Sequence, residues 1–246
     1  MMAYTSSIFI TVEDKNDLFD LYKVMQETNT DTYEFFNIYS GSSSHRITIT
    51  GDSILWLFCR NNQLTALDVS RNTALAYLFC NDNQLKVLNV SLNTGLVYLS
   101  CYYNQLTALN ISKNTLLREL FCDGNLLTTL DLSKNTALRR LSCSRNSLTK
   151  LDVSRNTELY YLWCVDCHLT TPALNDLFRK LPYHPNAYRV QSARVGSPPP
   201  MYTLDIAGNP GESYCDRSIV RARGWGFYEP VIRPKFSSRQ IDSEKF

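Results

Sequence analysis

Proline is missing from most of this chain: all nine prolines among the 246 residues lie at position 172 or later. Because proline lacks the amide hydrogen that a paired strand needs, its absence suits closely stacked strands up to that point. Long apolar runs are missing too, since nothing approaches the about 18 apolar residues of a spanning helix. The start, MMAYTSSIFITVEDK, has neither a basic segment nor a long apolar one. We therefore expect no membrane span and no signal peptide in this chain.

The chain also has no large excess of charge of either sign. Its 25 Lys and Arg residues nearly balance its 23 Asp and Glu residues, for a net charge of +2. A dedicated nucleic-acid binder would normally show a concentrated basic face, so we expect no nucleic-acid partner. A hydrophobic fraction of 44% excludes disorder of the whole chain.

Catalytic motifs are equally scarce. The sequence contains no G-x-S-x-G, no H-E-x-x-H and no glycine-rich phosphate loop, and its three histidines, His45, His168 and His184, are scattered. We expect no enzymatic activity and no cofactor.

Cysteine, by contrast, is abundant and regular. Six of the eight cysteines follow one another at intervals of 21 residues: Cys59, Cys80, Cys101, Cys122, Cys143 and Cys164. Around each of them runs the pattern L-x-x-L-x-C-x-x-N-x-L, as in ILWLFCRNNQLTALDVSRNTA at 54–74. This pattern matches the leucine-rich-repeat template with cysteine in place of the usual leucine at the sixth position.

Each repeat position has a physical reason. The fourth and sixth residues, such as Leu57 and Cys59, alternate with variable positions and are predicted to point to the buried face of a short strand. The ninth residue, such as Asn62 or Asn83, lies where the chain leaves the strand, and its amide can satisfy backbone groups inside the coil. Small buried cysteines of this kind are predicted to be reduced.

The second half of each repeat is too short and too rich in Asp, Ser, Asn and Thr for a helix. The sequence therefore predicts a leucine-rich-repeat solenoid of the right-handed β-α superhelix class. Short parallel strands would line its concave face, the convex side would be mostly non-helical, and helices would lie in the caps.

Three regions are expected. Residues 1–53 form an N-terminal cap with a helix over 16–28 and a strand over 45–52 that pairs with the first repeat. Residues 54–181 hold six repeats, the last of which merges into a helix that begins near Thr171-Pro172. Residues 182–246 form a C-terminal cap with a loop over 183–201 and a further strand near YTLDIAGNPG.

The C-terminal cap carries a resemblance. TTPALNDLFRKLP at 170–182 and DIAGNPGESYCDRSIVRARGW at 205–225 resemble the cap of bacterial cell-surface leucine-rich-repeat proteins whose repeats follow the same pattern. The resemblance covers about residues 45–228. It implies recognition outside the cell or at the cell envelope rather than catalysis, although this chain shows no export signal.

Cys167 and Cys215 stand outside the 21-residue series and suggest a disulfide between them. A zinc site at Cys164-Val-Asp-Cys167-His168, completed by Cys215 or His184, is the weaker alternative, because a single C-x-x-C without a second pair is poor evidence. We expect no metal.

Aromatic residues occupy the outward positions of the predicted strands and suggest a ligand-binding surface. The candidates are Trp56, Phe58, Tyr77, Phe79, Tyr98, Tyr102, Tyr103, Phe121, Tyr161 and Trp163. A protein or peptide is the expected ligand, and a glycan stacked on the rings is an alternative. A purely structural role remains open if the rings only stabilise the sheet or are covered by residues 1–44.

Overall fold

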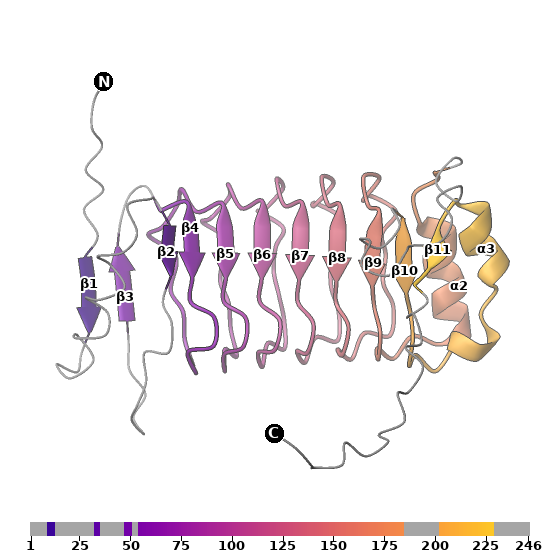
Figure 1. The fold of residues 1–246 in the computed structure, drawn as a ribbon, viewed down its shortest axis with the longest axis horizontal. Coiled ribbons are helices and arrows are strands. Elements are labelled where there is room, and N and C mark those ends of the chain that lie inside the picture. Colours follow the sequence, from indigo (N-terminus) through magenta and orange to yellow (C-terminus); the bar gives the residue numbers. More distant parts are fainter. Residues whose placement is uncertain (1–8, 13–31, 35–46, 51–53, 185–201, 229–246) are drawn as a thin grey trace, which may run out of the picture.

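Short strands recur every 21 residues in the computed structural model, which describes residues 9–12, 32–34, 47–50, 54–184 and 202–228. Each of these strands begins at the third position of a repeat, and neighbours pair in parallel with equivalent positions opposite, as Trp56 opposite Tyr77. Figure 1 shows them as one row of arrows. The six strands are β4 (Trp56–Phe58), β5 (Tyr77–Phe79), β6 (Tyr98–Ser100), β7 (Glu119–Phe121), β8 (Arg140–Ser142) and β9 (Tyr161–Trp163).

The sheet extends beyond the repeats at both ends. Its order is β11-β10-β9-β8-β7-β6-β5-β4-β2, and every pairing is parallel. The added strands are β2 (Thr32–Glu34), β10 (Thr203–Asp205) and β11 (Gly226–Phe227). The strand predicted near YTLDIAGNPG is confirmed as β10, and the predicted leucine-rich-repeat architecture is confirmed.

One predicted pairing is wrong. The strand expected over 45–52 exists as β3 (Ile47–Thr50), but it pairs antiparallel with β1 (Phe9–Val12) and not with the first repeat. A parallel neighbour must be reached by a crossover of about a dozen residues or more, and only residues 51–55 separate β3 from β4. The place beside β4 is taken by β2, with Tyr33 opposite Leu57.

The core is a ladder of leucine and cysteine. The fourth and sixth residues of each repeat are buried, as predicted, and so are the isoleucine or leucine at the first position and the leucine at the eleventh. The asparagines turn inward as predicted: Asn104 Oδ1 accepts from the Leu85 amide at 3.0 Å, and its Nδ2 donates to the Cys80 carbonyl at 3.0 Å. Equivalent bonds recur at Asn83, Asn125 and Asn146.

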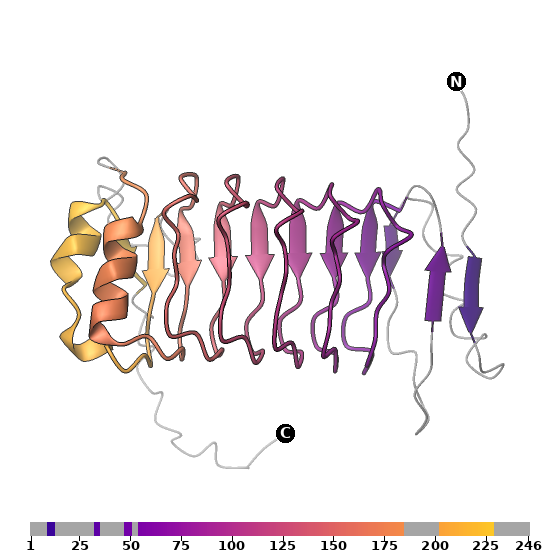
Figure 2. The ribbon, with the colours of Figure 1, turned by 180° about the vertical axis from the view of Figure 1, so that it is seen from behind.

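The return side of each coil contains no helix between residues 54 and 170, as Figure 2 shows. A second row of buried asparagines holds it, since Asn114 Nδ2 donates to the carbonyls of Val90 and Asn93 at 3.0 and 2.8 Å. Asn93, Asn135 and Asn156 make the same bonds in their coils. The predicted non-helical convex side is therefore confirmed.

Helices close the C-terminal end, where α2 (Thr171–Lys180), α3 (Arg217–Ala222) and the 3-10 helix η2 (Glu212–Tyr214) lie beyond the last repeat strand (Figure 1). The helix α2 starts with proline in its first turn and buries Leu174, Leu177 and Phe178, as the sequence predicted. Trp225 is fully buried and donates from Nε1 to the Pro182 carbonyl at 2.9 Å.

The helix predicted over 16–28 and most of the loop predicted over 183–201 lie outside the described residues. Within the part that is described, no helix combines the length and the apolar character needed to cross a membrane.

Candidate binding face and its rim

The strand face consists of the side chains at the third and fifth positions of the six repeats. In β4 and β5 these side chains are half-buried, whereas the central Leu57 and Leu78 are buried. The half-buried candidates on this face are Trp56, Phe58, Tyr77, Phe79, Tyr98, Phe121 and Trp163.

Tyr161 departs from the expected exposure, because only 8% of its surface is accessible. The Arg140 guanidinium lies 5.0 Å from the centre of its ring, and the Trp163 ring lies 4.9 Å away. These two neighbours enclose the Tyr161 ring, so most of it is unavailable to a ligand.

The rings of neighbouring strands are stacked face to face. Trp56 and Tyr77 have ring centres 3.6 Å apart and planes 3° apart. Phe58 and Phe79 follow with 4.3 Å and 9°. Because neighbouring rings cover these faces, the strand face offers ring edges in this region more than ring faces.

Tyr98 is a third-position residue, but its ring lies among the side chains of the fifth position. Its ring lies 4.5 Å from the Phe79 ring and 5.5 Å from the Phe121 ring. The fifth position of its own strand is the small, buried Ser100, whose hydroxyl donates to Asn81 Oδ1 at 3.1 Å. The Tyr98 ring therefore joins two phenylalanines that Ser100 would otherwise leave separated.

In the coil of β8 the fifth position is again a small residue, the buried Ser142, and the Arg140 side chain fills the gap between the Phe121 and Tyr161 rings. Its guanidinium carbon lies 5.4 Å from the Phe121 ring, and its Nη1 donates to Glu119 Oε2 at 3.1 Å. A cation between two aromatic rings is attracted by both of them. The resulting row is Phe58, Phe79, Tyr98, Phe121, Arg140, Tyr161, Trp163 and Tyr228.

Tyrosine hydroxyls on this side have few internal partners. The hydroxyl groups of Tyr77, Tyr98 and Tyr102 make no hydrogen bond with the described residues, and the Tyr102 ring packs edge-on against Tyr103 at 5.5 Å. Burial, and then the nearby Glu119, raises the pKa of Tyr98 above its ordinary value of 10.0. Burial also raises the pKa of Tyr102, so the Tyr98 and Tyr102 phenols stay protonated at neutral pH and can donate to a ligand.

A carboxyl group lies beside the row. Asp123 Oδ1 accepts from the Ser142 hydroxyl at 2.5 Å and from the Ser144 amide at 2.9 Å. Burial raises the pKa of this carboxyl above its ordinary value of 3.8, against the opposing effect of those hydrogen bonds. Asp123 is thus held by the fold and is not an open ligand for a cation.

The question of whether residues 1–44 cover the strand face lies outside the described residues, except for the backbone of β1 and β2.

The rim of the strand face consists of the eighth residue of each repeat, and all six have a left-handed backbone with φ between 49° and 59°. Asn, Asp and Gly are the residues that adopt this conformation most readily. The series is Asn61, Asp82, Tyr103, Gly124, Arg145 and Asp166, and Gly208 follows β10 with φ 72°. Within this series of rim residues, only Tyr103 and Arg145 are residue types that this conformation disfavours.

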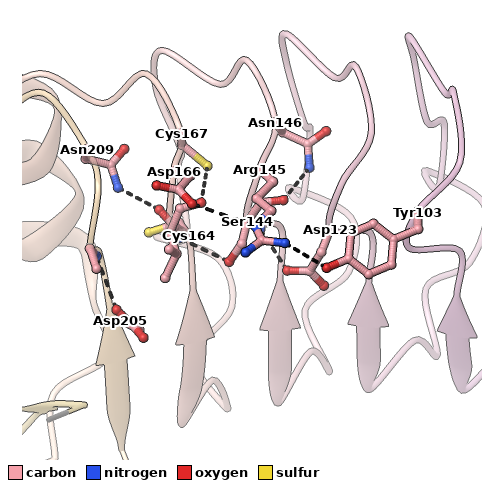
Figure 3. Close-up of polar contacts among 12 residues, drawn as sticks. Tyr103, Asp123, Ser144, Arg145, Asn146, Cys164, Asp166, Cys167, Asp205 and Asn209 are labelled. Atoms are coloured by element: carbon pink, nitrogen blue, oxygen red, sulfur yellow. Dashed lines mark hydrogen bonds and ion pairs between the residues drawn. The ribbon is translucent and has the colours of Figure 1, made fainter. Parts of the chain in front are cut away.

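These two unusual residues contact each other. Arg145 Nη1 donates to the Tyr103 hydroxyl at 2.9 Å although 42 residues separate them, and Arg145 Nε lies 3.7 Å from Asp166 Oδ2 (Figure 3). Gly124 lies between them in the series, and a Cβ there would fall 2.3 Å from Tyr103 Cδ1. Glycine at 124 therefore leaves room for the Tyr103 ring to reach Arg145.

The energies do not favour a purely stabilising role for this contact. The Tyr103–Arg145 hydrogen bond contributes about 1 kcal/mol, and an exposed ion pair such as Arg145–Asp166 adds about 0–1 kcal/mol, whereas each bulky left-handed residue costs on the order of 1–3 kcal/mol. Strained residues of this kind gather at functional sites, so the rim belongs to the candidate site.

Comparison with solved structures finds the same fold in bacterial leucine-rich-repeat proteins. The functional domain of InlJ from Listeria monocytogenes, described as including a cysteine ladder, matches with 32% identity and a TM-score of 0.56 over 71% of this chain and 34% of that one. A leucine-rich-repeat protein of Leptospira interrogans matches with 23% identity and a TM-score of 0.54 over 71% of this chain and 42% of that one.

An internalin, InlF, from Listeria monocytogenes matches with 20% identity and a TM-score of 0.53 over 70% of this chain and 53% of that one. The chain is a leucine-rich-repeat protein whose fold matches that of bacterial leucine-rich-repeat proteins. It spans about a third to a half of the length of these structures. No protein-family model and no curated protein matches the sequence.

The cysteines of this leucine-rich-repeat protein are all free. Cys167 and Cys215, suggested above as a disulfide, are not joined: the Cys167 thiol donates to the Cys143 carbonyl at 3.4 Å, and the Cys215 thiol donates to the Glu212 carbonyl at 3.1 Å. The difference arises because Cys167 occupies the ninth position of its repeat and turns inward like an asparagine. Within the described ranges, no group of His, Cys, Asp and Glu could hold a metal ion.

The candidate residues proposed from the sequence of this leucine-rich-repeat protein did not include Arg140, Arg145 and Asp166. For Arg145 a signal was present, because it and Tyr103 interrupt a column that otherwise contains only Asn, Asp and Gly. For Arg140 the signal was weaker: Ser142, at the fifth position of the same strand, is small and leaves space for the long side chain at the third position.

Proposed function

We propose that the strand face recognises a protein or peptide partner. The observation that carries this proposal is the combination of stacked rings, which present their edges, with tyrosine hydroxyls at 77, 98 and 102 that lack partners among the described residues. Tyrosine and tryptophan dominate the energetics of protein interfaces. Unpartnered phenols can bond to the amides and carbonyls of a peptide backbone.

The same geometry gives less support to carbohydrate binding. A sugar stacks on an open ring face, and Trp56 and Tyr77 cover one face of each other at 3.6 Å. A purely structural role draws support from the stacking itself, because aromatic pairs stabilise neighbouring strands. The six repeat strands span roughly 24 Å, five steps of about 4.8 Å, which is enough for an extended peptide segment.

Selection from a library of displayed random peptides tests the proposal. Peptides should be enriched on the intact chain, and Tyr77→Phe should weaken them by about tenfold or less, because it removes one hydroxyl and keeps the stack. Tyr77→Ala should weaken them further. Leu92→Ala, which changes a side chain on the return side that is 56% exposed, is the matched control and should have no effect.

The other outcomes separate the alternatives. Binding on a glycan array that Tyr77→Ala abolishes would support the carbohydrate alternative. If no peptide and no glycan binds, and Tyr77→Ala and Tyr98→Ala strongly lower the melting temperature, the row of rings is structural.

We also propose that this recognition takes place at the cell envelope or outside the cell. The support is the resemblance of the repeats and the C-terminal cap to bacterial cell-surface proteins, together with the 32% identity to the InlJ domain. Labelling of intact cells with a membrane-impermeant reagent tests this location, and labelling that requires cell lysis would contradict it.

A further inference from the structure

The Tyr103–Arg145 contact leaves two hydrogen-bond donors unused. Arg145 gives Nη1 to the Tyr103 oxygen at 2.9 Å, and its Nε lies 3.7 Å from Asp166 Oδ2. Its Nη2 donates to no group in the described part of the chain. The Tyr103 oxygen acts as the acceptor in this contact, so its own proton is free to be donated.

The two donors are exposed and held in place. Tyr103 is 46% exposed, and the Arg145 side chain is 61% exposed. The left-handed backbone at both residues and the glycine at 124 fix how the ring and the guanidinium meet. Gly208 makes room on the other side, because a Cβ there would fall 1.9 Å from Asp166 Oδ1.

A neighbouring pair of N–H and O–H donors, one of them charged, matches the two oxygens of a carboxylate. Asp166 offsets some of the Arg145 charge, so the pair would add selectivity to a larger contact and would not hold an anion alone. Arginine and tyrosine are also the residue types most enriched at interface hot spots.

We propose that Tyr103 and Arg145 select a partner peptide with an acidic side chain, whose carboxylate binds at the rim while the rest of the peptide lies on the strand face. This inference rests on the proposed function. It adds the chemistry of one position in the ligand, an aspartate or glutamate.

The peptides selected on the intact chain provide the test. They should share an acidic residue, and its replacement by the matching amide should weaken binding about tenfold. Arg145→Gln should cause a similar loss, and combining it with the amide peptide should cause no further loss. Tyr103→Asn should also weaken binding and should fold normally, because asparagine occupies this position in the first repeat.

Arg155→Gln, which removes an exposed positive charge from the return side, is the matched control and should leave binding unchanged. Peptides without an acidic consensus, or equal losses for Arg145→Gln and Arg155→Gln, would overturn the inference. If such peptides still depend on Tyr77, the proposed function survives. If no peptide is enriched, both proposals fail.

Discussion

The Cys167 thiol has the same relationship to Cys143 that the Asn146 amide has to Cys122. Each donates to the carbonyl of the cysteine 24 residues earlier, at 3.4 Å and 3.0 Å respectively. Asn146 also accepts from the Leu127 amide at 3.0 Å, whereas Cys167 has no amide oxygen to offer Leu148. Cys167 therefore continues the asparagine ladder as a donor but does not accept a hydrogen bond as the asparagines do.

Cys167→Asn should restore the missing acceptor. Because one buried hydrogen bond contributes about 1 kcal/mol, we expect the melting temperature to rise by roughly 2–4 °C. Cys167→Ala, which removes the donor as well, should lower it. Thermal unfolding followed by circular dichroism measures both, and an asparagine variant no more stable than the parent would contradict this interpretation of the ladder.

The fit between Tyr98 and Ser100 can be tested by exchanging their sizes. Ser100→Phe should destabilise the fold by about 1–3 kcal/mol, because the new ring competes with Tyr98 for one space. Adding Tyr98→Ser should recover some of that loss. Denaturant unfolding of the parent, both single variants and the double variant gives the coupling energy, and additive effects would show that the two sites are independent.

Thiol chemistry distinguishes the eight cysteines. Burial raises the pKa of Cys59 and of Cys101 to about 12 and also raises that of Cys215, but Cys215 is half-buried whereas the other seven cysteines are buried. In the folded chain we expect a thiol reagent to label Cys215 alone at a substantial rate. In denaturant without reductant all eight should react, and the mass of the alkylated chain counts them. A count of six would restore the Cys167–Cys215 disulfide.

Asp123 gives a pH dependence of defined sign. Its carboxyl has a pKa raised by burial above 3.8, so the folded state holds the proton more tightly than the unfolded state does. Stability should therefore fall as pH rises from 3.8 through the folded-state pKa, and then level off.

Asp123→Asn should accordingly stabilise the fold at neutral pH, with a gain that vanishes below pH 3.8. Urea unfolding across a pH series measures it. Asp131→Asn is the control, because hydrogen bonds from Ser133 lower the pKa of Asp131 and its replacement should bring no gain. A gain at Asp123 that is the same at every pH would contradict the electrostatic explanation.

The repeat period made the interior predictable. Leu57 and Cys59 had to share one strand face because their spacing is two residues, and every coil repeats that choice. Asn104 was predictable as well, since an amide at the strand end has carbonyls of two coils within reach. The helix α2 followed from the spacing of its apolar residues.

The outer surface was less predictable, because its contacts join positions that the repeat does not relate. Tyr98 and Ser100 both point outward, and only the space above Ser100 decides that the Tyr98 ring turns toward Phe79 and Phe121. Similarly, the sequence identified the strand over 45–52 from its alternation, but alternation does not reveal that β1 is its partner.

The ladder bonds also bear on how the length of such a molecule can change. Asn125 reaches the Cys101 carbonyl of the preceding coil and the Cys122 carbonyl of its own, and no coil further away. A duplicated 21-residue unit would find the same interior partners, so the core sets no limit on the number of coils. The strand face does set one, because Tyr98 needs Ser100 beneath it and a phenylalanine on each side. The buried residues of the coils are thus interchangeable, whereas the side chains of the strand face depend on the order of the coils. Duplication of a coil would change the contacts on the strand face and leave those of the core as they are.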